Sequence, residues 1–548
     1  MPNVGIRKLF TVQPDVLNIM DATNKVITTY GNSAIDENEI IVPVKVAHPL
    51  VVAKSVIIPN DTKESLFVCS QPGKIFKYRD NKVSLIADLS FYTGSQDVMP
   101  LGAPTDFPVP EYDERGLLGI EFHKDFKCNN RMFLYFSAAD ELQPTTKHPS
   151  GPPNTPCNEC SSETATIKCE WDETKYTHTN VLEEWRYIPG CRNHPDSIKK
   201  IRRLLSIKQP FFNHDSLDNL FYLAEEDKLV MFTGDGGFRD APYLLTQNDN
   251  YFHGKAISID INSKLWKNYD AAPVARFAEL PHNIRHLLEV RIKGIHNWSG
   301  MTTMPNPKHS DQLLKIMGQP GQDTTEAVYI MKTLEHPREC ECEEVVPRNL
   351  GFPGWEGSIP ALQNIQCDGV YTDNIGNFKN LTNYQLAISL AIDHEVPYCE
   401  YYHNDDRFPG GKGGVVIVGQ QPYLSNHIAC LSNRLIVADW GLNSLNSGVE
   451  FPYGSPSDGG LLWCVPIDNK LNKLHKMERI NILYNWKNEF TDSQYPLTNK
   501  AFSNDQISRP FFMGLASNIH KTRLYLLTYN RVGSKEINGL GVIYEFVC

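Results

Sequence analysis

The segment FFNHDSLDNLFYLAEEDKLVMFTGDGGFRD, residues 211–240, decides the fold. Two short runs of aromatic and aliphatic residues, FYL (221–223) and LVMF (229–232), stand on either side of the polar turn AEED. Such runs bounded by turn residues predict two neighbouring strands. Polar loops flank the pair, with Asn213–Ser216 before the first strand and Gly234–Gly237 after the second. Because binding and catalytic groups concentrate on loops held by a rigid scaffold, both loops are candidates for a site.

The same pattern of a short apolar segment, a turn and a strongly β-forming run recurs along residues 46–548. Six occurrences contain the runs LFV (66–68), MFLYF (132–136), LVMF (229–232), LLKI (313–316), LIVA (435–438) and LYLL (524–527). Six units of several strands each predict an all-β chain folded as a six-bladed β-propeller. Residues 1–45 lack the pattern, so we expect them to form an N-terminal extension.

The six units are irregularly spaced, which predicts long loop insertions between strands. The largest, at about 140–180 and 335–400, are rich in Pro, Cys and polar residues. The central channel of a propeller is the default place for a pocket. Helical periodicity is scarce. Leu381–Ile392 is the best candidate helix, and Ser197–Leu205 is a second.

Composition excludes several classes of protein. Apolar residues make up 41% of the chain and charged residues 21%, as in ordinary globular proteins. The formal net charge is −11 and no basic stripe is present, which argues against a nucleic-acid partner. No apolar run reaches the length of a membrane span. The first 21 residues lack a continuous apolar core, so no secretory signal is expected. The sequons at Asn60, Asn297 and Asn380 are accordingly interpreted as chance matches.

The chain has 13 cysteines, an odd number, so at least one stays free or forms an intermolecular disulfide. Cys157, Cys160, Cys169 and Cys191 form either a zinc site or two disulfides. The cluster lacks the second CxxC of a zinc finger, which favours disulfides. This content indicates an oxidising location such as the surface of an assembled particle. Abundant Asn, Ile, Lys and Tyr are compatible with a large virus, and hence with a virion protein.

Three residues could carry chemistry: His214 and Asp235 in the two loops that flank the strand pair, and Glu114 further upstream. His214 can accept a proton near neutral pH, although a loop histidine bonded to nearby backbone is the simpler interpretation. Asp235, between Gly234 and Gly236, could orient a base or hold a cation, or could serve turn geometry alone. Glu114 precedes a predicted buried strand and by itself reads as half of a surface charge pair.

Residues 114–126, ERGLLGIEFHKDF, resemble the soluble quinoprotein glucose dehydrogenase/sorbosone dehydrogenase family, including its Hedgehog-interacting-protein-like branch. Further matches follow in the family's order over about residues 46–548. They are SQPGKI (70–75), residues 213–237, GQPGQ (318–322) with Glu326, ADW (438–440) and GVIYE (541–545). The resemblance implies a six-bladed propeller, in agreement with the count of repeats.

The resemblance also implies site roles. Enzymatic members oxidise sugars with pyrroloquinoline quinone (PQQ) and calcium, and the cofactor supplies the redox chemistry. His214 matches the catalytic base, with Asp235 beside it. Glu114 and Asp240 match positions that contact substrate. Asn297 and Gln319 match positions that contact the cofactor. The backbone carbonyls of Pro320 and Gly321 match those that hold calcium, a cation that prefers oxygen ligands.

The departures from the family pattern concern positive charge. PQQ carries three carboxylates, which need cationic partners. Where the enzymes have a lysine, this chain has SDGG (457–460), and where they have two arginines it has FFMG (511–514), with Arg509 nearest. His296 stands in place of another arginine, and Asp240 in place of a glutamine. Losing three charge-assisted hydrogen bonds of ~1.5–3 kcal/mol each would weaken PQQ binding roughly a thousandfold or more.

Two functions follow. The first is a quinone-dependent aldose dehydrogenase with His214 as general base. The second is a non-catalytic propeller of the Hedgehog-interacting-like branch, acting as a binding or structural surface protein with a sugar or glycan as partner. The missing cations, the cysteines and the long insertions favour the second. The catalytic motif around His214 favours the first.

Overall fold

The computed structural model describes thirteen stretches of the chain, apart from isolated positions within them (72, 175, 177, 192–193, 212–213, 323, 389, 415, 468–470 and 472). The stretches are 2–12, 15–17, 44–46, 50–89, 114–138, 171–237, 243–337, 343–360, 388–403, 414–441, 460–483, 510–530 and 540–547. Nearly all regular structure in them is β, as the apolar runs separated by Gly, Asn, Asp and Pro predict.

Four sheets follow one another along the chain, each built from consecutive antiparallel strands. The first holds β4 (Leu50–Ile57), β5 (Glu64–Ser70), β6 (Lys74–Arg79) and β7 (Lys82–Asp88). The second holds β8 (Leu117–Phe122), β9 (Arg131–Ala138), β10 (His178–Ile188) and β11 (Ser197–Gln209). The third holds β12 (Leu220–Leu223), β13 (Lys228–Phe232), β14 (Lys255–Ile259) and β15 (Leu288–Lys293), extended by β19 (Arg348–Asn349). The fourth holds β16 (Met301–Asn306), β17 (His309–Gln319), β18 (Thr325–Met331) and β22 (Cys399–Tyr402).

An eight-stranded sheet completes the molecule. One part is the meander of β23 (Ile417–Tyr423), β24 (Arg434–Asp439), β25 (Leu461–Pro466) and β26 (Glu478–Leu483). The other part is β27 (Phe511–Ser517), β28 (Leu524–Asn530), β29 (Leu540–Val547) and β1 (Asn3–Val12). The two parts join where β1 pairs parallel with β26.

Two short strand pairs and six helical turns lie outside the main sheets of the described residues. The pairs β2 (Asp15–Leu17) with β3 (Val44–Val46) and β20 (Trp355–Glu356) with β21 (Ile359–Pro360) are two-stranded. The helical turns are α1 (Phe126–Asn129), α2 (His282–Arg285), η3 (Leu245–Gln247), η4 (Lys264–Asn268), η5 (Phe277–Glu279) and η6 (Ala429–Leu431).

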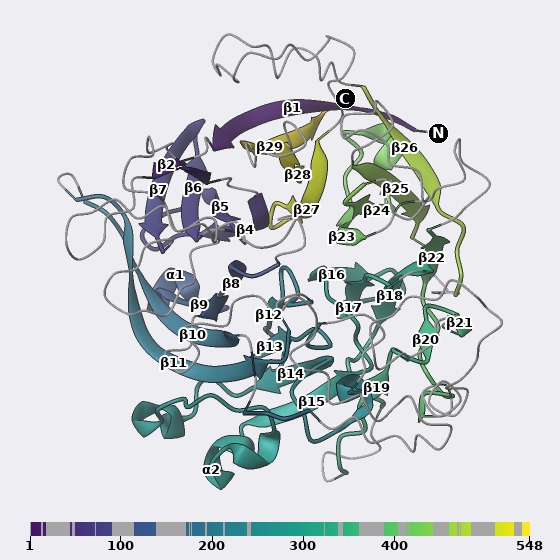
Figure 1. The fold of residues 1–548 in the computed structure, drawn as a ribbon. Coiled ribbons are helices and arrows are strands. Elements are labelled where there is room, and N and C mark those ends of the chain that lie inside the picture. Colours follow the sequence, from purple (N-terminus) through teal and green to yellow (C-terminus); the bar gives the residue numbers. More distant parts are fainter. Residues whose placement is uncertain are drawn as a thin grey trace, which may run out of the picture.

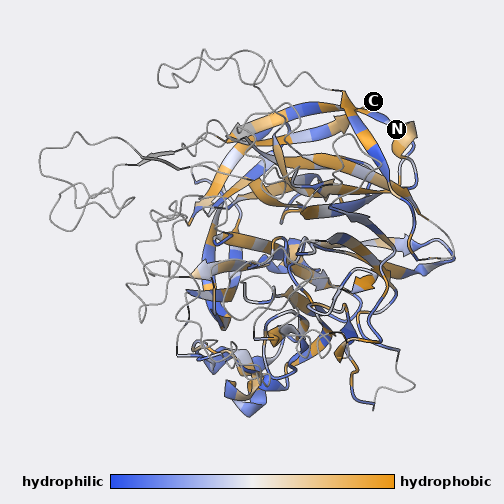
Figure 2. Ribbon diagram, turned by 45° about the vertical axis from the view of Figure 1, so that its right-hand side comes forward, coloured by the Kyte–Doolittle hydropathy of each residue, from blue (hydrophilic) through white to orange (hydrophobic). Residues whose placement is uncertain are grey.

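The sheets stand radially around a common centre in a propeller-like arrangement (Figure 1). The first strand of each meander lies innermost, and contacts run from β4 to β8, β12, β16, β23 and β27 and back to β4. Apolar side chains between neighbouring sheets form the core, while hydrophilic residues mark the helical turns near α2 (Figure 2). The predicted all-β, propeller-like architecture is therefore confirmed. Four sheets are separate, and β23–β29 with β1 form one eight-stranded sheet.

The first strand of the chain belongs to the last sheet. β1 pairs antiparallel with β29, from Gly5 opposite Val547 to Val12 opposite Gly541. Its buried residues Val4 and Ile6 join the same apolar cluster as Tyr544 and Phe546. Residues 3–12 of the predicted extension therefore lie within the propeller sheet. They resemble no repeat because the rest of their sheet comes from the other end of the chain.

The predicted helix at Ser197–Leu205 is wrong, because these residues lie in β11. Its basic side chains pair with acids on the neighbouring strand: Lys200 and Arg203 with Glu183, and Arg202 with Glu184. The apolar residues of this segment have a helix-like spacing, yet they lie on a strand. The charged residues between them form ion pairs with the neighbouring strand. The other candidate helix, Leu381–Ile392, falls mostly outside the described residues, which include only helical turns at Ile388 and Leu390.

Most of the insertion at 140–180 and much of that at 335–400 lie outside the described residues, as do Cys157, Cys160, Cys169 and Asn380. The described cysteines are free: Cys69, Cys128, Cys191, Cys399, Cys430 and Cys464. Among the described residues no helix is long and apolar enough to cross a membrane.

Candidate functional site

Residues 214–219 run from β11 to β12 through the centre of the propeller and carry His214 on an irregular backbone. His214, Ser216 and Asp218 all have positive φ, at 60°, 68° and 48°. Backbone hydrogen bonds fix the segment on both sides, from Leu217 N to Trp298 O at 3.0 Å and from Asp218 N to Leu118 O at 2.9 Å. Non-glycine residues at positive φ persist only where the surroundings hold them, and they concentrate at functional sites.

Asp215 anchors this segment below the surface. Its Oδ1 accepts a hydrogen bond from Asn180 Nδ2 at 2.7 Å and contacts His178 Nε2 at 3.2 Å. All three side chains are buried. A buried carboxylate held in this way fixes the position of the neighbouring His214.

Asp235 enters the site from the turn that follows β13. Its backbone N–H donates to His296 O at 2.8 Å, and its Oδ1 accepts from Gly237 N at 2.8 Å. Gly234 is required for the close approach of the His214 loop, because a Cβ there would lie 1.8 Å from His214 O. The glycines around Asp235 therefore bring two loops into contact.

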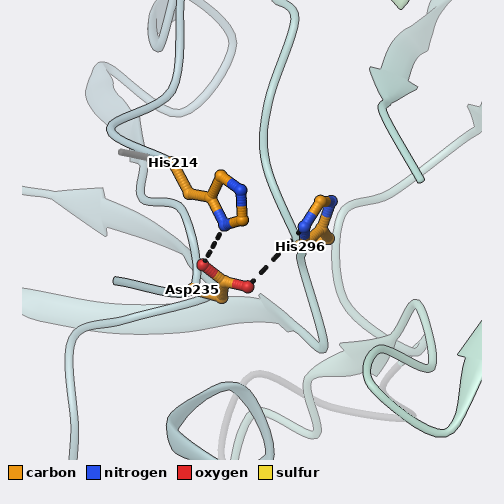
Figure 3. A group of neighbouring side chains, drawn as sticks. All are labelled: His214, Asp235 and His296. Carbon is orange, nitrogen blue, oxygen red and sulfur yellow. Dashed lines mark hydrogen bonds and ion pairs between the residues drawn. The ribbon is translucent and has the colours of Figure 1, made fainter. Parts of the chain in front are cut away.

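The structure brings four of the candidate site residues together: His214, Asp235, Glu114 and Asn297. His214 Nδ1 and Asp235 Oδ1 lie 2.8 Å apart (Figure 3). Glu114 Oε2 accepts from the His214 backbone N–H at 2.8 Å and from Asn297 Nδ2 at 3.1 Å. The His214 side chain is 14% exposed whereas Asp235 is fully buried. The imidazole is therefore held from behind and reaches solvent on one side.

His296 completes the cluster. Its ring lies edge-on to that of His214, with centroids 4.4 Å apart. Its Nδ1 lies 3.0 Å from Pro320 O, so it donates a hydrogen bond to that carbonyl. Its Nε2 points towards Asp235 Oδ2 at 3.8 Å (Figure 3). The ligand atoms of His214, Asp235 and His296 all lie within 4.8 Å of one another.

Burial and neighbouring charge set the protonation of these groups. Burial alone would lower the pKa of His214, but the carboxylates of Asp235, Glu114 and Asp215 outweigh it and raise the pKa to about 9. Burial and the nearby His214 lower the pKa of His296 to about 4. Burial raises the pKa of the Glu114 carboxyl against the opposing effect of His214. The pKa of one imidazole, His214, is therefore raised and that of the other, His296, is lowered.

The remaining predicted site residues are less closely connected. The Pro320 carbonyl reaches the cluster through His296. Gln319 is buried at the end of β17, and a Cβ on Gly321 would meet Thr325 O at 2.0 Å. Among the described residues, no hydrogen bond joins either of them to His214 or Asp235. Asp240 lies outside the described residues.

The described residues do not fit PQQ. The charged groups that raise the pKa of His214 are all carboxylates, which would repel a tricarboxylate. Where cations are needed, Phe511 stacks on Trp440 with centroids 4.3 Å apart, and the Phe512 ring packs against Gly460. Asp458 and Arg509 lie outside the described residues. A calcium site at residues 320–321 gains no support either, because the Pro320 carbonyl already accepts the proton of His296 Nδ1.

His296 is the member of the cluster that sequence reasoning did not select. In the sequence it appears only as a replacement for an arginine next to Asn297. The available signal was its position directly beside a predicted site residue. Its proximity to Asp235 depends on the Asp235 N–H bonding to the His296 carbonyl, a contact between distant parts of the chain.

No protein-family model matches the chain. It is similar to the HIPL1 protein of Arabidopsis thaliana, with 22% identity over 421 residues that make up 73% of this chain and 53% of that protein. The chain thus spans about half the length of this curated relative.

Two solved structures are also similar. The PQQ-bound aldose sugar dehydrogenase of Streptomyces coelicolor is 12% identical with a TM-score of 0.44, over 91% of this chain and 99% of that one. The soluble aldose sugar dehydrogenase of Escherichia coli in its apo form is 13% identical with a TM-score of 0.45, over 91% and 96%.

Proposed function

We propose that this chain is a glucose/sorbosone dehydrogenase-like propeller that takes a sugar at the His214 end of its channel and uses His214 as the proton acceptor. The observation that carries the proposal is the 2.8 Å contact between His214 Nδ1 and the buried carboxylate of Asp235. The order of the motifs over residues 46–548 and the similarity to HIPL1 support the assignment to this kind of propeller.

Six blades are part of this proposal. The eight-stranded sheet divides into two meanders, β23–β26 and β27–β29 with β1, and each supplies one innermost strand to the ring. We count each meander as one blade because the join between them is the short parallel pairing of β1 with β26 at their outer edges. A strand from the N-terminus then completes the last blade and closes the ring.

The geometry suits an oriented base. In the neutral ring, which forms as the pH rises above the raised pKa of His214, Nδ1 donates to Asp235, and the other ring nitrogen, Nε2, carries a lone pair and points away from the carboxylate (Figure 3). An imidazole held in this tautomer can take a proton from a hydroxyl group within hydrogen-bonding distance. Glu114 and Asn297, hydrogen bonded to one another, supply polar contacts beside it for further hydroxyl groups. Oxidation would in addition need an electron acceptor, and the described residues do not fit PQQ.

A second candidate is a sugar-binding propeller without turnover. It is favoured by the three carboxylates around His214 and by the aromatic residues Phe511 and Phe512 where cations would neutralise PQQ. The polar contacts of Glu114, His214 and Asn297 would then serve recognition alone.

One set of measurements tests both. The full chain is titrated with an aldose panel by calorimetry, and turnover is followed with PQQ, Ca²⁺ and an artificial electron acceptor. The same is done with His214→Gln and with the control His253→Gln, a buried histidine whose Nε2 bonds to Lys208 O. Sugar-dependent turnover that is lost only in His214→Gln supports the proton acceptor. Sugar binding without turnover supports the second candidate, and no sugar binding at millimolar concentration overturns both.

A further inference from the structure

The atoms Asp235 Oδ2 and His296 Nε2 face one another 3.8 Å apart (Figure 3). Both are buried, and neither has a hydrogen-bond partner among the described residues. Because Nδ1 of His296 donates to Pro320 O, Nε2 of the neutral ring carries a lone pair. A lone pair and a carboxylate oxygen repel one another, and at 3.8 Å they are too far apart for a hydrogen bond. Buried polar atoms without partners are rare and cost free energy unless something binds them.

We propose that His214, Asp235 and His296 form a binding site for a single divalent transition-metal ion of the zinc class. Two imidazoles and one carboxylate are a ligand set that such ions use, and zinc sites with three protein ligands keep a fourth position open. With metal–ligand bonds of about 2.0–2.2 Å, ligand atoms around one ion lie roughly 3.0–3.5 Å apart. The observed separations are 2.8 Å from His214 Nδ1 to Asp235 Oδ1 and 3.8 Å from His296 Nε2 to Asp235 Oδ2, and the ligand atoms of the three residues all lie within 4.8 Å of one another. The three side chains would therefore have to rotate towards a common centre to hold one ion.

The contacts behind the three side chains fit this role. Metal-binding histidines commonly donate their other ring N–H to a carbonyl, and metal-binding carboxylates are themselves hydrogen bonded. His296 donates to Pro320 O, and Asp235 Oδ1 accepts from Gly237 N. The third ligand, His214, is partly exposed, which leaves an open side for water or a hydroxyl group.

Metal binding would change the chemistry of the site. The ion would replace the proton shared by His214 Nδ1 and Asp235, so metal binding and proton acceptance by His214 exclude one another. A water molecule on the ion would become the proton acceptor, since zinc lowers the pKa of bound water to about 7. The inference concerns these three residues alone and does not require that the proposed sugar chemistry is correct.

The test is a metal titration of the full chain after treatment with a chelator. Zn²⁺ binding is measured by calorimetry, and Co²⁺ binding by its visible absorption, which reports nitrogen and oxygen ligands as distinct from thiolates. The reference protein should carry His282→Gln and His286→Gln, because these exposed histidines, in and directly after α2, have their Nε2 atoms 3.0 Å apart and could bind zinc themselves. In that background one equivalent of Zn²⁺ should remain bound, and Ca²⁺ should not displace it.

The variants His296→Gln and Asp235→Asn should each lower the affinity for this Zn²⁺ ion at least about 100-fold. His253→Gln, which alters a nearby buried histidine outside the cluster, should leave the affinity for Zn²⁺ unchanged. Circular dichroism establishes that each variant is folded, and His296→Gln can still donate to Pro320 O through its amide. The proposal is overturned if the background binds no zinc, if its Co²⁺ spectrum shows thiolate ligation alone, or if a folded His296→Gln variant binds as tightly as the background.

Discussion

At the scale of single residues, the site depends on how closely two loops approach. Gly234 has no room for a side chain, because a Cβ would lie 1.8 Å from His214 O and 2.7 Å from His214 C. These are backbone atoms and cannot rotate away. Gly234→Ala should therefore lower the free energy of unfolding by about 1–3 kcal/mol, as overpacking does elsewhere, and displace His214 from Asp235. Urea denaturation measures the first effect, and Zn²⁺ or sugar titration measures the second.

Gly514→Ala is the matched control, because the nearest atom to its Cβ would be Val51 O at 3.2 Å. It should cost clearly less stability and leave ligand binding unchanged. Equal stability of Gly234→Ala and the wild type would show that the two loops are not in contact.

The candidate site could be predicted from the sequence only in part. His214, Asp235, Glu114 and Asn297 were found because each lies within a recognisable local motif, and the structure brings them together. The role of His296 could not be found in this way. It depends on the orientation of one ring, fixed by Pro320 O, relative to a carboxylate from another turn. The sequence around His296 does not determine how its ring is oriented relative to Asp235.

At the scale of elements, Lys521 ties three innermost strands together. It lies between β27 and β28, and its Nζ donates to Thr302 Oγ1 of β16 at 2.8 Å, to Ser517 Oγ of β27 at 3.0 Å and to Gln421 Oε1 of β23 at 3.4 Å. Burial and the charge of Lys54 lower its pKa to about 8, against the opposing carboxylates of Asp218, Glu121 and Glu64. The folded state therefore releases this proton before the unfolded state, whose lysines titrate near 10.4.

Between those values the unfolded chain binds more protons, so this lysine makes stability rise with pH. The stability of the wild type relative to Lys521→Met should increase by on the order of 2–3 kcal/mol from pH 7 to about 10, measured by urea denaturation. Relative to the same Met variant, Lys521→Arg should show no such increase, because arginine stays charged throughout. A difference between wild type and Lys521→Met that does not change with pH would contradict the lowered pKa.

The prediction of a helix failed in an outer strand of the second sheet. The segment SIKKIRRLL (197–205) has apolar residues at a helix-like spacing, yet it forms the outer strand β11. Its charged residues pair across the strand with Glu183 and Glu184. Of residues 197–205 only Leu204 and Leu205 are buried, so the alternation that marks a strand is weak in this segment. The second strand of each meander was predictable, because β5, β9, β13, β17, β24 and β28 coincide with the β-forming runs of the six repeats.

At the scale of the whole molecule, the repeats predict the propeller but not its closure. Nothing in residues 3–12 indicates that they pair with residues 541–547, since the pairing joins opposite ends of the chain. The alternation of buried Val4 and Ile6 with the half-buried Gly5 and the exposed Arg7 marks a strand with one apolar face. Which sheet that face completes is decided by the ring, because only the last meander lacks an outer strand.

This closure predicts that damage to β1 destabilises the entire propeller and does not merely fray one end. Ile6 is buried among Tyr544 and Phe546, so Ile6→Ala should lower the global free energy of unfolding by about 2–4 kcal/mol. Lys8→Ala, at an exposed position of the same strand, should change it by less than ~0.5 kcal/mol. Urea denaturation followed by tryptophan fluorescence and by circular dichroism should give coincident transitions for both variants, shifted only in Ile6→Ala. If Ile6→Ala instead leaves the global transition in place and increases hydrogen exchange in β1 alone, the N-terminal strand is an accessory to the ring and not its closure.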